Sequence, residues 1–430
     1  MKRSNDTNFV LQVQKYTKVL ASVALLTFLL ASCGIFSDPT FSPNPVQFAE
    51  TIVIEEDSVS LAGFPNQPAQ QKPSIAAPQL GIDRLHLFTD SLIGKRIAVV
   101  ANQTSVVKDI HLVDTLLALK LNVVKVFAPE HGFRGDADAG QHIGHSTDDK
   151  TGLPLVSLYG SNKKPTDEQL ADIDIVIYDI QDVGVRFYTY ISTLHYVMEA
   201  CAENNKQLVV LDRPNPNGHY VDGPVLEPTY KSFVGMHPVP IVYGMTIGEY
   251  AMMINGEGWL KEGVKCELKV ISIQNYTHST IYQPPINASP NLPNSKAINL
   301  YPSLCFFEGT NMSMGRGTAN QFQIIGSPFL KGDLYNYEFI PKPNIGAKYP
   351  IHEGDICKGL NLQNEPRLNY IELKWLIDAY QNSSNKIVFF NPFFTKLAGQ
   401  ELLQKKIENG WNAQQIRASW KDDIEKYKRL

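Results

Sequence analysis

The stretch IDIVIYDI at residues 173–180 is apolar over most of its length and rich in β-branched side chains, and it decides the fold. Three further stretches share this character, at residues 96–101, 123–128 and 207–211. The segments 111–119 and 193–203 lie between these stretches and have helical patterns. Continuous apolar strands separated by helices predict an α/β fold with a Rossmann-like parallel sheet that is covered on both faces.

The later part of the chain mixes short helices and short strands. Thr246 followed by Glu249 has the spacing of a capping box, which predicts a helix over 246–256. Short strands are predicted at 267–273, 321–325 and 386–390. Helices are predicted at 371–381, at 400–409 with Gly410 as the C-terminal cap, and at 412–428. This mixture predicts a smaller α+β domain after the parallel sheet.

The folded region is predicted to start near Gln79 and to hold two domains, because about 350 residues are more than one core usually serves. The boundary is placed near the turn Gln283-Pro284-Pro285. The predicted parts are a signal peptide (1–32), a lipidated proline-rich tether (33–78), the Rossmann-like domain (79–288) and the α+β domain (289–430).

The N-terminus has the three parts of an export signal: a basic leader, an apolar run over 19–30, and small residues before Cys33. The apolar run is shorter than the roughly 20 residues that a permanent membrane helix needs. Leu30-Ala31-Ser32-Cys33 resembles a lipobox, so we expect cleavage before Cys33 and a membrane anchor of acyl chains on that cysteine. The alternative is an ordinary signal peptide that ends near a cysteine.

The residues that follow Cys33 refine the expected location. Seven prolines between residues 34 and 78 indicate a tether that holds the folded part away from the membrane. Gly34 is not the aspartate that favours retention at the inner membrane. The expected location is therefore the cell envelope, lipid-anchored at the outer membrane and facing the periplasm.

Charge and cysteine content exclude several classes. Without residues 1–32 the chain loses four basic residues and one acidic residue, which moves the net charge from −4 to about −7. No basic tract stands out, so nucleic acid is not expected as a partner. The four remaining cysteines form no CxxC pair. A zinc site or a disulfide framework is unsupported, and one long-range disulfide or four buried thiols remain the alternatives.

Polar segments follow the four predicted strands of the parallel sheet. They read NQT (102–104), PEHGFRG (129–135), DIQDVGVRFY (179–188) and DRPNPNG (212–218). In an open parallel sheet, ligands bind beyond the carboxyl ends of the strands. A ligand site is therefore predicted at this edge, with Asn102 and Gln181 among its polar side chains.

Glu130 is the best candidate for a catalytic residue. It follows a strand and adjoins His131 and two glycines, which let a ligand approach the backbone closely. Partial burial raises the pKa of such a carboxyl and makes it a usable general acid near neutral pH. The alternative is a structural Glu130 that caps the next helix or pairs with Arg134.

Asp182, Arg186 and Tyr188 lie on the next polar segment. Arginine binds a carboxylate through a two-pronged fork, and tyrosine stacks on sugars, so this loop suits a sugar or its carboxylate. The alternative is an Asp182–Arg186 pair that locks the loop. Arg213 lies in a segment with two prolines, which is also compatible with a rigid turn.

In the second half, SPNLP (289–293) and FEGTNMSMGRGT (307–318) are predicted loops, and the latter could face the first domain across a cleft. They contribute Asn291, Glu308, Asn311 and Arg316 as candidate binding residues. Ser313 lacks a serine-hydrolase elbow, because position 311 is Asn where Gly is needed.

Several standard cofactor signatures are missing. The chain has no HExxH, no phosphate-binding GxxxxGK[ST] and no dinucleotide-binding GxGxxG after the first strand. Three histidines, at 131, 142 and 145, occur together, but no convincing ligand spacing accompanies them. Neither a metal nor an organic cofactor is predicted.

Together these motifs resemble the NamZ-type exo-β-N-acetylmuramidases over about residues 80–430. The resemblance rests on PEHGFRG (129–135), DIQDVGVRFYTY (179–190), DRPNPNG (212–218), SFVG (232–235), YGMTIGEYA (243–251), SPNLP (289–293) and FEGTNMSMGRGT (307–318). One difference is Asn320-Gln321-Phe322, where the family often has a proline before the phenylalanine.

The resemblance implies a Rossmann-like domain, a smaller C-terminal domain and an active-site cleft between them. It implies release of N-acetylmuramic acid from the non-reducing end of peptidoglycan fragments, without a cofactor. The family's catalytic glutamate matches Glu130. Muramyl saccharides from peptidoglycan are then the expected partners. The alternative function is a lipoprotein that binds muropeptides or glycans without chemistry. A third alternative is an esterase or amidase that acts on a peptidoglycan substituent, but the sequence lacks the serine elbow and the metal signature of such enzymes.

The second catalytic group stays open at this stage. Asp182 or Glu308 could be the second carboxylate of a glycosidase, the substrate's 2-acetamido group could be the nucleophile, or His131 could act with Glu130. The lactyl carboxylate of muramic acid needs a cationic partner. The arginines available are Arg134, Arg186, Arg213 and Arg316.

Overall fold

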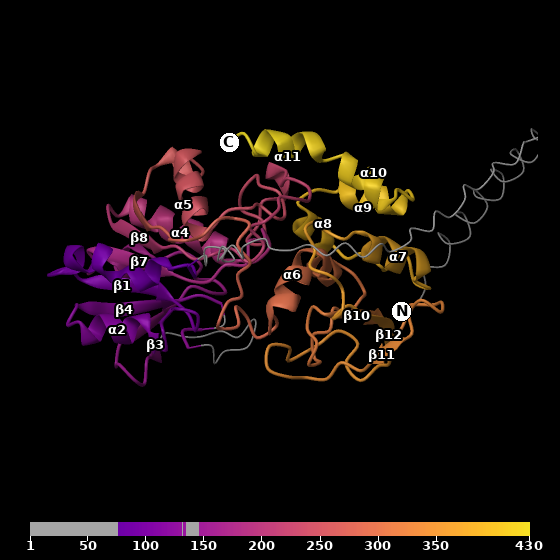
Figure 1. Cartoon of the computed structure of the whole chain (residues 1–430), viewed down its shortest axis with the longest axis horizontal. Helices are drawn as coiled ribbons and strands as arrows, with labels where there is room; N and C mark the ends of the chain where they lie inside the picture. The colour runs from indigo at the N-terminus through magenta and orange to yellow at the C-terminus, as the bar shows by residue number, and fades with distance from the viewer. Residues whose placement is uncertain (1–75, 131, 135–145) are drawn as a thin grey trace, which may run out of the picture. The chain divides into compact units, whose positions relative to one another are not determined.

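The larger sheet of the computed structural model has seven strands in the order β5-β6-β4-β1-β7-β8-β9 (Figure 1). The structure describes residues 76–130, 132–134 and 146–430. In chain order the strands are β1 (Ile97–Ala101), β4 (Val123–Ala128), β5 (Ser146–Thr147), β6 (Pro154–Ser157), β7 (Ile175–Asp179), β8 (Gln207–Leu211) and β9 (Glu267–Ile271). Only β5 pairs in antiparallel fashion, so the predicted parallel sheet is confirmed.

The strand order reverses beside β1. The chain places β4 and β6 on one side of β1 and then crosses to add β7, β8 and β9 on the other side. In open α/β sheets such a reversal leaves a crevice at the carboxyl ends of the strands. The residues that follow β4, β6 and β7 therefore begin at one edge.

Helices cover both faces of this sheet. Ile97 and Val99 of β1 pack in one hydrophobic cluster with α2 (Leu112–Ala118). Ala98 and Val100 belong to a second cluster with α4 (Tyr190–Glu203) and α5 (Ile247–Gly256), because successive strand residues point to opposite faces. The predicted capping box of α5 is present: Thr246 caps the helix and Glu249 bonds back to it.

The second half contains a three-stranded antiparallel sheet with the order β10-β12-β11 and several helices. Its elements are α6 (Ser295–Leu304), β10 (Ile324–Ser327), β11 (Tyr337–Phe339), β12 (Cys357–Asn361), α7 (Lys374–Asn382), α8 (Phe393–Ala398), α9 (Leu402–Glu408), α10 (Ala413–Ala418) and α11 (Lys421–Tyr427). The first half adds the short strands β2 (Val106–Val107) and β3 (Ile110–His111) and the helix α3 (Asp167–Leu170). The 3-10 helices are Gly81–Leu87, Thr89–Leu92, Pro228–Tyr230, Lys261–Gly263 and Cys305–Gly309.

Two predicted elements of the second half are wrong. The segment 386–390 is not a strand; only Phe390 forms an isolated bridge, with Thr310. The predicted helix 412–428 is two helices, α10 and α11, because the chain leaves the helical conformation at Trp420, whose indole is buried. Periodicity alone cannot separate one bent amphipathic segment from two short helices.

The core is continuous between the two sheets. The rings of Phe187 and Tyr301 meet edge to face with centroids 5.3 Å apart, and both belong to the cluster that covers one face of the larger sheet. The described residues belong to one compact unit, and the boundary at 288/289 stays a prediction. All four cysteines of this unit are free buried thiols.

The predicted signal peptide, Cys33 and most of the tether lie outside the described residues. Within the described part of the chain, no helix is long and apolar enough to span a membrane.

Candidate active site

A pocket of about 330 Å³ lies at the carboxyl edge of the larger sheet and is closed by segments of the second half. We call it the Glu130 pocket. From the first half it is lined by Glu130, Tyr159, Gly160, Lys163, Phe187, Tyr188, Thr189, Tyr190, Phe233 and Val234. From residues 289–397 it is lined by Ser289, Asn291, Leu292, Tyr301, Cys305, Glu308, Arg316, Phe322, Phe393 and Leu397.

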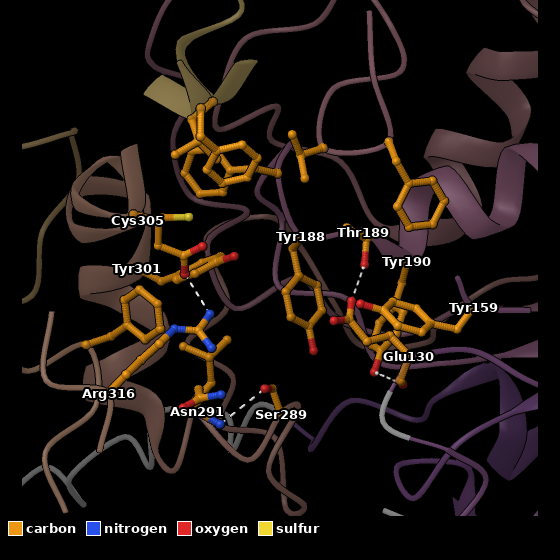
Figure 2. A pocket seen from close by; sticks show the side chains of 18 of the residues that line it. Glu130, Tyr159, Tyr188, Thr189, Tyr190, Ser289, Asn291, Tyr301, Cys305 and Arg316 are labelled. Atoms are coloured by element: carbon orange, nitrogen blue, oxygen red, sulfur yellow. Dashed lines mark hydrogen bonds and ion pairs between the residues drawn. The ribbon is translucent and has the colours of Figure 1, made fainter. Parts of the chain in front are cut away.

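Glu130 is held at the end of β4 by hydroxyl groups (Figure 2). The Thr189 hydroxyl donates to Glu130 Oε2 at 3.1 Å, and the Tyr190 hydroxyl donates to the Glu130 backbone oxygen at 3.3 Å. Burial raises the pKa of Tyr159, and the neighbouring Glu130 carboxylate raises it further. These contacts orient one carboxyl group at the pocket wall, which is what a general acid requires.

A charged pair stands on another side of the pocket (Figure 2). Arg316 Nη2 donates to Glu308 Oε1 at 2.6 Å, and the Arg316 guanidinium lies 5.4 Å from the centre of the Phe322 ring. Glu130 lies on the other side of the view, with Tyr159 and Thr189. The pocket therefore presents a carboxyl group and a paired guanidinium from different walls.

Aromatic side chains and amides complete the lining. Tyr188 meets Tyr190 edge to face at 4.9 Å, and its hydroxyl donates to the Ala288 carbonyl at 2.7 Å. Asn291 donates from Nδ2 to the Gly346 carbonyl at 2.7 Å. Aromatic faces combined with fixed polar groups suit a small polar ligand with an apolar ring face, such as a sugar.

Asp182 does not line the pocket, so its predicted catalytic role is corrected. Its Oδ2 accepts from the Gly184 backbone at 2.6 Å and from the Tyr243 hydroxyl. The side chain is almost fully buried, and burial raises the pKa of Asp182 to about 6. The carboxyl group shapes the turn at Gly184 instead of facing a ligand.

Arg186 is also structural, and its predicted contact with substrate is corrected. It is fully buried, and its two terminal nitrogens donate to backbone carbonyls. The acceptors are Pro224, Val239, Leu397 and Ala398. This guanidinium ties the loop after β7 to α8, so an anionic ligand cannot reach it.

The other two predicted arginines of the first half are paired outside the pocket. Arg213 forms a two-pronged bond with Asp179 at 2.7 and 2.9 Å, and both side chains are buried. Arg134 pairs with Asp148 and Asp114. Neither arginine lines the Glu130 pocket, so the structure does not bring them to the predicted site.

Three predicted amides serve the backbone. Asn102 Oδ1 accepts from the backbone and hydroxyl of Thr104, and Gln181 donates to the carbonyls of Asp182 and Pro214. Asn311 lies outside the pocket lining, and its Nδ2 donates to the Asn385 carbonyl at 3.4 Å. None of the three lines the Glu130 pocket. His131, His142 and His145 lie outside the described residues.

The structure therefore brings together Glu130, Tyr188, Asn291, Glu308 and Arg316. It adds lining residues that the sequence analysis missed: Tyr159, Lys163, Thr189, Phe233 and Tyr301. Tyr159 and Lys163 follow β6, a strand left out of the predicted sheet. The run LPLVSLYG at 153–160 carried the missing signal, since it is an apolar segment that ends in a polar loop.

Comparison with known proteins gives consistent matches along the chain. Residues 97–296 match the family model described as "Exo-beta-N-acetylmuramidase NamZ, N-terminal", and residues 299–430 match the corresponding C-terminal model. The peptidoglycan β-N-acetylmuramidase NamZ of Bacillus subtilis (strain 168) is 37% identical over 388 residues, which cover 84% of this chain and 91% of that protein.

Two crystal structures of DUF1343 family proteins from Bacteroides fragilis NCTC 9343 have similar folds. One is 47% identical with a TM-score of 0.76, and the other is 31% identical with a TM-score of 0.71. Each match covers 82% of this chain and 97% of the other chain.

Proposed function

Because the chain belongs to the NamZ family, we propose that it is an exo-acting peptidoglycan β-N-acetylmuramidase that releases N-acetylmuramic acid from non-reducing ends. It is a glycoside hydrolase that acts on peptidoglycan. The observation that carries the exo-acting mode is the Glu130 pocket itself. Its volume of about 330 Å³ is near the lower end for small-ligand sites, which suits a terminal sugar better than an internal segment of a glycan.

We assign the general acid to Glu130, which would protonate the leaving oxygen of the scissile bond. The Thr189 hydroxyl donates to one of its oxygens, and Tyr159 also hydrogen-bonds the carboxyl group. Tyr190 fixes the backbone of the same residue. The side chain is thereby oriented before substrate arrives, which lowers the cost of reaching the reactive geometry.

We assign the attack on the anomeric carbon to the substrate's own 2-acetamido oxygen. Among the described residues that line the pocket, Glu308 is the one carboxylate besides Glu130, and Arg316 occupies it. Asp182, the other candidate, is outside the pocket lining. Glycosidases that act on N-acetylated sugars in this way need no carboxylate nucleophile.

The test uses the 4-nitrophenyl β-glycoside of N-acetylmuramic acid and peptidoglycan oligosaccharides. We expect release of nitrophenol, and free N-acetylmuramic acid as the first sugar product from the oligosaccharides. Release of internal fragments would contradict the exo-acting mode. Tight binding of the glycoside without any hydrolysis would instead support a non-catalytic binding protein.

We also propose that the mature protein is lipid-anchored at Cys33 in the cell envelope, on the outer membrane and facing the periplasm. Leu30-Ala31-Ser32 before this cysteine and the apolar run at 19–30 support the proposal. Labelled palmitate should be incorporated into the wild-type chain and not into Cys33→Ala. In cell fractionation, the wild-type chain should be found with the outer membrane and Cys33→Ala with the soluble periplasm. Equal labelling of the two would refute the anchor.

A further inference from the structure

Among the described arginines, Arg316 is the one that lines the Glu130 pocket. Arg186 and Arg213 are buried on other partners, and Arg134 is paired with two aspartates outside the pocket lining. Arg316 lines the pocket and keeps 29% of its side chain exposed. Among the described residues its ion-pair partner is Glu308, through Nη2. A guanidinium carries five N–H donors, so most of them remain for a ligand.

The local backbone holds this arginine in place. Gly315 and Gly317 on either side have φ values of 83° and 80°, in the region that glycine favours. A Cβ at Gly315 would lie 2.6 Å from the Asn320 carbonyl oxygen, and one at Gly317 would lie 2.7 Å from Pro350 Cβ. The backbone on either side of Arg316 is therefore closely packed, which fixes the position from which its side chain extends.

Phe322 supports the same guanidinium at some cost in backbone energy. Its φ of 52° is unusual for a residue with a bulky side chain. The ring is buried, lies 5.4 Å from the Arg316 guanidinium, and meets Tyr301 edge to face at 4.9 Å. Strained backbone that persists at a ligand pocket points to a functional constraint.

We propose that Arg316 binds the lactyl carboxylate of the terminal muramic acid and that Glu308 positions Arg316 for this contact. The inference rests on the proposed function, which places the anomeric carbon beside Glu130. The lactyl ether leaves the sugar ring at C3 and extends away from the anomeric carbon, so its carboxylate reaches a wall other than that of Glu130. Arg316 stands on such a wall (Figure 2). A guanidinium fork matches a carboxylate in shape and charge.

Lys163 provides the matched control, because it is the other cationic residue that lines the pocket in the described part of the chain. Its ammonium group lies 4.6 Å from the centre of the Phe233 ring. Lys163 follows β6, as Tyr159 does, and Tyr159 lies beside Glu130. Comparing variants of the two cationic residues therefore distinguishes specific binding of an anion by Arg316 from a general attraction of the pocket for anions.

The experiment pairs each protein variant with a neutralised substrate. The substrates are the nitrophenyl muraminide with a free lactyl carboxylate and the same glycoside with a primary lactamide. Wild type should prefer the acid in kcat/KM by roughly 10- to 100-fold, the range of a hydrogen bond to a charged group. Arg316→Met should lose a similar factor on the acid and show no preference, whereas Lys163→Met should keep the preference of the wild type.

Binding provides a readout that needs no turnover. Calorimetry with N-acetylmuramic acid and N-acetylglucosamine should show preference for the muramic acid in wild type and not in Arg316→Met. If Arg316→Met fails to fold, Arg316→Lys replaces it and should show an intermediate preference, since lysine keeps the charge without the fork.

The outcomes separate the inference from the proposed function. Equal hydrolysis of acid and amide by wild type would overturn the role of Arg316 and leave the muramidase activity standing. Loss of the preference in Lys163→Met, or its persistence in Arg316→Met, would also overturn it. Selective binding through Arg316 without hydrolysis of either glycoside would uphold the inference and refute the enzyme.

Discussion

The loops after β4 and β6 and the loops after β7 and β8 leave the same edge of the sheet, yet they use their polar side chains differently. After β4 and β6, Glu130, Tyr159 and Lys163 line the pocket. After β7 and β8, the charged side chains of Asp182, Arg186 and Arg213 are buried on partners within the protein. Only uncharged residues of the β7 loop, Phe187 to Tyr190, line the pocket.

The difference teaches that a dense run of polar residues at a strand end marks the edge of the sheet without identifying the ligand contacts. Such a run must first satisfy its own turns, because buried backbone and charged groups need partners. Arg186 alone supplies donors to four carbonyls. The loop after β7 has several charged side chains, yet none of them lines the pocket, because partners within the protein already bind them.

The largest expected effect contrasts the two carboxyl groups. Glu130→Gln should lower kcat/KM by about 10²- to 10⁴-fold, since it removes general-acid catalysis and little else. Asp182→Asn should keep kcat/KM within a few-fold, because this carboxyl lies outside the pocket lining and an amide can still accept from Gly184. Steady-state kinetics on the nitrophenyl muraminide measures both. Comparable losses in two folded variants would erase the contrast between the loops.

The next effect concerns the stability contributed by a buried ion pair at the carboxyl ends of β7 and β8. Asp179→Asn should lower the free energy of unfolding by about 3–5 kcal/mol, because it leaves the buried Arg213 without its carboxylate. Urea denaturation measures the loss. Asp172→Asn is the matched control, since the Asp172 side chain that pairs with Lys125 is 55% exposed, and the expected cost is under 1 kcal/mol. Similar costs for both would show that the buried pair is not structural.

A smaller effect comes from His195, which is a buried residue of α4. Burial lowers the pKa of His195 to about 4, with Glu199 opposing the shift and Lys231 and Lys164 adding to it. The folded pKa is below the unfolded value of 6.5, so the stability from neutral His195 is full above pH 6.5 and is lost as pH falls toward 4. Between pH 7 and pH 5 this loss is about 2 kcal/mol.

The variant His195→Gln isolates this histidine, because the glutamine keeps hydrogen-bonding groups and does not titrate. When the pH is lowered from 7 to 5, the free energy of unfolding of the variant, measured by urea denaturation, should rise by about 2 kcal/mol relative to that of the wild type. Asp182 and Asp212, whose pKa values burial raises to about 6, have the opposite sign and cancel in the difference. A constant difference across this range would refute the assigned pKa.

The smallest effect probes the hydroxyl that holds the general acid. Thr189→Val removes the donor to Glu130 Oε2 and should lower kcat by roughly five- to tenfold, the value of about 1 kcal/mol for one hydrogen bond. Thermal stability should change little, since the two side chains have similar volumes. An unchanged kcat would show that Glu130 does not depend on Thr189 for its orientation.

The outcome for Glu130 and Arg186 shows how far the sequence alone could go. The apolar strands, the capping box at Thr246 and the position of Glu130 after a strand were all predictable, because each depends on residues close together in sequence. The sequence suggests a substrate contact for Arg186 because a guanidinium on a loop at the ligand edge suits a carboxylate. Its actual acceptors include the Leu397 and Ala398 carbonyls, more than 200 residues away, which no local pattern reveals.

The sequence by itself determined the parallel sheet, the edge where the polar loops gather and the family to which the motifs point. Hydrophobic periodicity records burial, and burial follows from each residue's own transfer free energy. The tertiary structure decided which charged groups line the pocket. Pairing depends on distances of a few ångströms between segments far apart in the chain, so only the packed fold could leave Glu130 and Arg316 in the pocket while Asp182, Arg186 and Arg213 found partners elsewhere.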